Sequence, residues 1–170
     1  MLRGFVNTEG RYFGIDQLRD AHPRPGLSRR LLPGFDLDAV DERGRARLAQ
    51  LRDAVRAFVA GAAGAEDDLS RVASRVPVRV AVGQVDGRLT SRLVAPEPGP
   101  EQEIAAAVLS ALQVSMHDGR VERLRLCERP ECGWCYYDGT KNRSGRWCSS
   151  DPCGDVMKAR AFRARRRTAG

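Results

Sequence analysis

Apolar residues recur every three or four positions in three segments, and this spacing predicts helices at 38–60, 65–75 and 100–117. The first helix has the clearest apolar stripe, which consists of Leu48, Leu51, Val55, Phe58 and Val59. We expect Asp36 or Asp38 to cap it. Its four arginines lie mostly off the stripe and are expected to form a solvated face; they are Arg45, Arg47, Arg52 and Arg56. A shorter helix is expected near Asp16–Ala21.

A second pattern, with apolar residues at alternate positions, occupies residues 76–82 and 88–94. Alternation is typical of β-strands, and Asp86-Gly87 between the two runs is a hairpin-turn signal. The predicted fold class is therefore α+β. We expect residues 1–123 to form a mostly helical domain with one small antiparallel β-hairpin, and residues 124–170 to form a second, smaller domain.

The composition is that of a globular protein, with 42% hydrophobic and 30% charged residues in a chain of 170. No apolar run approaches the roughly 20 residues that span a bilayer, and residues 1–14 lack an apolar core of signal-peptide length. We therefore expect a cytoplasmic protein with no membrane partner, whose cysteines stay reduced and favour metal or redox chemistry over disulfides. No glycine-rich phosphate loop, carboxylate pair or histidine-based triad stands out, so we expect no enzymatic activity. His22 and His117 lie far from the cysteines and are not expected to bind metal.

All five cysteines lie within residues 127–153. A structural zinc site uses four ligands, and local spacing allows the first pair to be Cys127 with Cys132 or Cys132 with Cys135. Four residues separate Cys127 from Cys132 and also Cys148 from Cys153, and this matched spacing favours the longer pair. Four thiolates leave no coordination position open, so we expect one structural Zn²⁺ at Cys127, Cys132, Cys148 and Cys153. The alternatives are weaker, because iron–sulfur spacings usually differ and no βαβ pattern surrounds a redox dithiol at Cys132-Gly-Trp-Cys135.

The spacer between the two cysteine pairs contains a strand-like stretch at 134–137, turn-forming residues at 138–145 and a return strand at Arg146-Trp147. We expect this β-hairpin, packed by Trp134 and Trp147, to bring the pairs together. Helix propensity rises after Cys153, which places the last ligand at a helix start, where free N–H groups stabilise a thiolate. The order of knuckle, hairpin and helix predicts a treble-clef-like zinc finger.

Positive charge is concentrated at one end of the chain. Residues 1–126 carry 19 Arg and 17 acidic residues, whereas residues 127–170 carry 10 basic and 5 acidic residues, with no acid after Asp155. A one-sided basic segment is an electrostatic footprint for nucleic-acid phosphates. On a helix over 154–167, a stripe of Met157, Ala161 and Ala164 is expected to pack on the hairpin. The predicted DNA contacts are Arg143, Arg146, Lys158, Arg160, Arg163, Arg165, Arg166 and Arg167.

The segment Cys127–Arg167 resembles the CGNR zinc finger family. The matching parts are Cys127 and Cys132, Tyr137-Asp138, the run Lys141-Asn-Arg-Ser-Gly-Arg-Trp-Cys148, Cys153-Gly154, and the basic helix from Lys158. The resemblance implies that the four paired cysteines bind zinc and that Cys135 does not. The upstream residues resemble the associated ABATE domain, described as a stress-induced transcription regulator; Phe5-Val-Asn-Thr8 and residues 51–56 carry this likeness. One departure is that Asp155-Val156 replaces the Asn-Arg of the family motif.

These features predict a DNA-binding transcriptional regulator in the cytoplasm, associated with the nucleoid, with double-stranded DNA as partner and a small-molecule effector for the N-terminal domain. Two alternatives remain open. One is a zinc-scaffolded adaptor for protein or RNA, which the Asp155-Val156 change keeps in play. The other is a thiol redox sensor that uses Cys135.

Overall fold

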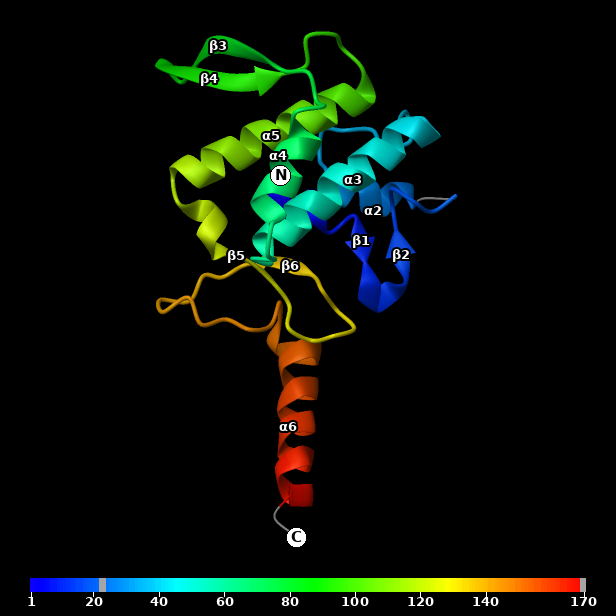
Figure 1. The fold of residues 1–170 in the computed structure, drawn as a ribbon, viewed down its shortest axis with the longest axis vertical. Coiled ribbons are helices and arrows are strands. Elements are labelled where there is room, and N and C mark those ends of the chain that lie inside the picture. The colour runs from blue at the N-terminus through cyan, green and yellow to red at the C-terminus, as the bar shows by residue number, and fades with distance from the viewer. Residues whose placement is uncertain (22–23, 169–170) are drawn as a thin grey trace.

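The structure is a computed structural model that describes residues 1–21 and 24–168, so His22 lies outside the described residues. It confirms the α+β class (Figure 1). The helices are α1 (Leu2–Val6), α2 (Pro25–Leu31), α3 (Glu42–Val59), α4 (Ala65–Ala73), α5 (Pro100–His117) and α6 (Asp155–Thr168). Three antiparallel pairs join β1 (Glu9–Gly10) to β2 (Ile15–Asp16), β3 (Arg79–Val85) to β4 (Arg88–Val94), and β5 (Leu124–Leu126) to β6 (Cys135–Tyr137). No helix of the described residues is long and apolar enough to cross a bilayer.

The core lies where α1, α3 and α5 meet. The stripe of α3 supplies buried Leu48, Leu51 and Val55, and α5 supplies Ile104 and Val108. These residues recur at helical spacing, so each helix buries one face against its neighbours. The predicted helices at 38–60, 65–75 and 100–117 are thus confirmed as α3, α4 and α5 with small shifts at their ends.

The start of α3 differs from the prediction. Its cap is Asp41, whose side chain accepts a hydrogen bond from the Gly44 N–H at 2.7 Å, and neither Asp36 nor Asp38 takes this role. A Cβ at Gly44 would lie 2.8 Å from a methyl of Val40, so only glycine fits this first turn without displacement. Gly44 has a low helix propensity, but its lack of a side chain lets Val40 and the Asp41 cap pack closely against the first turn.

The prediction of a short helix near Asp16–Ala21 is wrong. After β2 the chain turns, because the Asp16 carboxylate accepts hydrogen bonds from the backbone N–H groups of Leu18 and Arg19 at 3.0 and 3.2 Å. Such a side-chain-to-backbone bond stabilises a turn in place of a helix.

The prediction of a solvated arginine face on α3 is wrong for Arg52 and Arg56. Arg52 is fully buried and donates to both oxygens of Asp16, at 2.6 and 2.9 Å, and to Asp53 at 3.0 Å. Arg56 is also buried, whereas Arg47 stays exposed and pairs with Glu101. A buried guanidinium requires such partners, since an unpaired one is strongly destabilising.

The Asp16–Arg52 pair makes stability depend on pH. Burial alone would raise the pKa of Asp16, but hydrogen bonds and charge from Arg52 outweigh it and hold that pKa below its usual value. A depressed folded pKa gives stability that is present above the unfolded pKa, about 3.9, and is lost as pH falls through the lower folded value. We expect the stability difference between the wild type and Asp16→Asn, measured by urea unfolding, to shrink as pH falls from 7 to below 3. A constant difference would contradict this linkage.

The β3–β4 ribbon forms as predicted, with Asp86 and Gly87 both at positive φ in its turn. It lies at the end of the molecule opposite α6 (Figure 1), and most of its side chains are exposed, including Val82 and Leu89. One attachment to the body is the Leu93 N–H, which donates to the Ser110 hydroxyl of α5 at 3.1 Å. The ribbon therefore stands beside α5 rather than within the core.

Candidate metal centre

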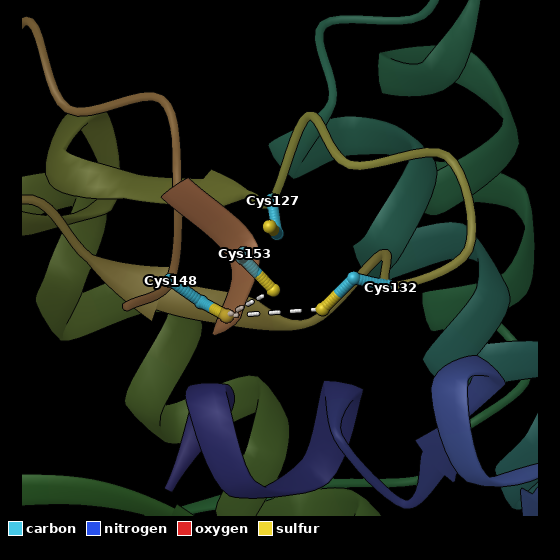
Figure 2. A group of neighbouring side chains, drawn as sticks. All are labelled: Cys127, Cys132, Cys148 and Cys153. Atoms are coloured by element: carbon cyan, nitrogen blue, oxygen red, sulfur yellow. Dashed lines mark hydrogen bonds between the residues drawn. The ribbon is translucent and has the colours of Figure 1, made fainter. Parts of the chain in front are cut away.

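The sulfurs of Cys127, Cys132, Cys148 and Cys153 point toward one another (Figure 2). Cys127 follows β5, Cys132 lies in the β5–β6 connection, and Cys148 and Cys153 flank the turn that precedes α6. All four sulfurs lie within 4.8 Å of one another, and Cys148 is 3.7 Å from both Cys132 and Cys153. Thiolates about 2.3 Å from a tetrahedral zinc ion are separated by roughly 3.8 Å, so this arrangement fits zinc.

The surroundings of the four sulfurs are those of a closed site. Cys127, Cys132 and Cys153 are buried and Cys148 is half-buried. Burial raises the pKa of Cys132, and it raises that of Cys148 to about 11, whereas hydrogen bonds from neighbouring thiols outweigh burial and lower the pKa of Cys153. Only a cation at the centre makes four adjacent thiolates stable together. The residues therefore form one structural zinc site.

Cys135 takes no part in this cluster. It is 0% exposed and packs in the core formed by α1, α3 and α5. Burial raises the pKa of its thiol to about 11. Reactive cysteines are accessible and have depressed pKa values, so this environment does not favour redox chemistry at Cys135.

The hairpin that carries the first pair differs from the prediction. The expected return strand at Arg146-Trp147 does not form, and β6 pairs instead with β5 upstream. The Cys127 N–H donates to the Trp134 carbonyl at 2.9 Å, which closes the connection that holds Cys132. The chain after β6 is held by the buried Asp138 carboxylate, which accepts from the N–H groups of Thr140 and Gly145 at 3.0 and 2.9 Å. Asp138 therefore has a structural role, since its carboxylate stabilises this turn.

Both tryptophans have a structural role, but they pack against the zinc ligands rather than on the hairpin that was predicted. A Cβ at Gly154 would lie 3.1 Å from the Trp147 ring and 3.5 Å from the Ser149 carbonyl. The glycine after the fourth ligand therefore lets the indole lie against the backbone where the chain enters α6.

The finger is joined to the helical body by polar contacts that the sequence did not reveal. Asn7 donates to the Cys135 carbonyl at 2.8 Å and accepts from the Cys135 N–H at 2.7 Å, so its amide pairs like a neighbouring strand. Arg56 donates to the carbonyls of Val6 and Gly133 at 2.7 and 2.6 Å. The two Asn7–Cys135 bonds and the Arg56–Gly133 bond cross between residues 1–123 and 124–170, so the two units share an ordered interface.

A second connection runs from the N-terminal unit to α6. The Arg129 guanidinium, in the first knuckle, lies over the Tyr12 ring with its carbon 4.6 Å from the ring centre. Glu131 accepts from Arg129 at 3.0 Å and pairs with Arg160 of α6 at 2.8 Å. This contact fixes the base of α6 against the knuckle.

The predicted DNA-contacting residues occupy two different environments. The six on α6, from Lys158 onward, are exposed on a helix that projects from the zinc site (Figure 1). The predicted packing of Met157, Ala161 and Ala164 on the hairpin is wrong, because α6 has no buried residue and Ala161 and Ala164 are exposed. The other two predicted DNA contacts already form ion pairs with acidic residues. Arg143 pairs with Glu122 at 2.6 Å, and Arg146 pairs with Glu128 at 2.7 Å.

A closed four-thiolate site between a strand pair and a helix defines a zinc finger. Residues 123–166 match the model of the CGNR zinc finger family, so this segment is a CGNR zinc finger. The match contains all four ligands and nearly the whole of α6. Among curated proteins, a search finds no match to the chain.

Proposed function

We propose that this protein is a transcriptional regulator that binds duplex DNA through α6, with zinc holding the helix in place, and that it is a binding protein rather than an enzyme. The observation that carries the proposal is that α6 stands clear of the body with an exposed basic surface and no buried residue. A helix that buries none of its residues gains little from packing on the body, so its charge suits a partner. The negative phosphates of a DNA duplex complement the positive charge of α6, and the major groove accommodates a single helix.

The distribution of charge supports this reading. Arg163, Arg165, Arg166 and Arg167 form no ion pair with any described residue, whereas Lys158 pairs with Asp155 and Arg160 with Glu131. Unpaired arginines on a free helix make positioning contacts to phosphate at low cost. Asp155-Val156 places an acid in the first turn, where it interacts favourably with the helix dipole, but it removes one cation near the ligands.

We expect DNA affinity to fall steeply with salt, with a log–log slope of about −0.9 for each phosphate contact. The double variant Arg163→Gln and Arg167→Gln should reduce the size of that slope by about 1.8. The matched control is Arg75→Gln with Arg88→Gln, which removes the same charge far from α6 and should leave the slope unchanged. Fluorescence anisotropy of a labelled duplex between 50 and 300 mM salt measures both.

Three outcomes are informative. Loss of affinity on chelation, with selection of a sequence motif from random duplexes, supports the regulator. Binding without sequence enrichment, or tighter binding to RNA or an acidic protein, favours the adaptor. Equal slopes for the α6 variant and its control contradict the proposal. On this proposal the N-terminal unit is an ABATE-like regulatory domain and the protein is associated with the nucleoid.

A further inference from the structure

A groove of about 1220 Å³ lies between the β3–β4 ribbon, α5 and the start of the chain. The ribbon end of the groove lies opposite α6 (Figure 1), and its other end reaches Leu124 of β5 and Tyr137 of β6. Small and apolar side chains contribute to its lining, among them Leu2, Phe35, Ala107, Ala111 and Val114. Ligand sites in proteins are concave, largely apolar and contain a few placed polar groups, and this groove has the first two properties.

The polar groups of the groove are mainly positive. Arg3, Arg79, Arg92 and Arg120 line it, against one acidic residue, Glu103. Arg120 pairs with Asp118 at 2.5 Å, but Arg3, Arg79 and Arg92 form no ion pair within the described chain. Three unpaired guanidinium groups from two separate segments therefore face one apolar hollow.

The register of the ribbon explains how two of these arginines share a face. Arg79 pairs with Val94 across the strands and Ala81 pairs with Arg92, so Arg79 and Arg92 lie two positions apart on the same side. Like charges placed this close repel each other unless an anion lies between them. Guanidinium groups bind carboxylates and phosphates in a bidentate manner, which gives the anion a defined position.

We propose that this groove binds a small amphipathic anion, with its apolar body on α5 and its carboxylate or phosphate between Arg79, Arg92 and Arg3. This site is separate from α6, and the inference does not depend on DNA binding. The ribbon is attached to the body through β4, and most of its side chains are exposed, so a ligand that bridges it to α5 also restrains it.

Decanoate and decyl phosphate test the site by isothermal titration calorimetry on the zinc-loaded protein. Both carry the same apolar chain, and the tighter binder identifies the headgroup. The variant Arg79→Gln with Arg92→Gln should weaken binding at least about tenfold, because each charge-assisted bond is lost. Arg88→Gln is the control, since Arg88 lies on the same ribbon but outside the groove. This variant should bind both anions as tightly as the wild type does. Ala107→Phe fills the floor and should weaken binding without altering the charge.

Hydrogen exchange gives an independent readout. Amides of β3 and β4 should become more protected when either anion is bound, and decanol at equal concentration should leave them unchanged. Three results would overturn the proposal: binding of neither anion, equal binding to the Arg79/Arg92 variant, or binding of decanol as tight as that of decanoate. If the wild-type protein binds neither anion and the Arg79/Arg92 variant loses DNA affinity, the arginines serve nucleic acid and the proposal fails.

Discussion

Replacing Cys127 with serine is expected to release the zinc ion and unfold the finger. Structural zinc contributes on the order of 10–16 kcal/mol of binding energy that becomes folding energy. The finger has little apolar core of its own, since the cluster around the site consists of the ligands and two partly buried tryptophans. Both tryptophans of the chain lie here. Zinc content after gel filtration and the tryptophan emission spectrum therefore report the loss directly.

The control for this experiment is Cys135→Ala. Cys135 is buried in the N-terminal core, and alanine leaves no unpaired polar group there. We expect one zinc per chain and a tryptophan spectrum like that of the wild type. If Cys135→Ala loses zinc and Cys127→Ser keeps it, the ligand set is wrong.

Replacing Arg52 with methionine is expected to destabilise the protein by about 3–5 kcal/mol, because it leaves the Asp16 carboxylate without its buried partner. Arg52 has no exposed surface and contacts Asp16 at 2.6 Å. Methionine preserves the length of the side chain and the helix propensity, so the lost charge dominates the change. Urea unfolding of the zinc-loaded protein measures the difference.

Arg47→Met serves as the matched control on the same helix. Arg47 also pairs with an acid, Glu101, but its side chain is 56% exposed. Exposed pairs contribute about 0–1 kcal/mol, so we expect a loss in that range. Equal losses for the two variants would show that burial does not set the strength of the Arg52 pair.

Features encoded by local sequence were predictable. The stripes of α3 and α5 recur at helical spacing, and Asp86-Gly87 specifies its turn, so these elements follow from neighbours in the chain. The matched spacing of the cysteine pairs similarly identified the four residues that the structure brings together.

Features that depend on distant partners were not predictable. Arg52 and Arg56 are buried because each has a hydrogen-bond partner from a distant segment. Asp16 is 36 residues from Arg52 in the sequence, and Gly133 is 77 residues from Arg56. Strand β6 had two candidate neighbours, and alternation along its own sequence does not tell β5 from residues 146–147. The small residues of α6 suggested a packing face, but no surface of the described chain lies there to receive it.

The direction of α6 is set at its base, by Cys153 just before the helix and by the Glu131–Arg160 contact in its second turn. With 14 residues, the helix extends about 21 Å beyond that base. A change of about 10° in its direction would move the far end by roughly 4 Å, close to the 3.4 Å step between successive nucleotides of a duplex strand. The angular stiffness of the zinc-bound base therefore determines which phosphates the terminal arginines reach.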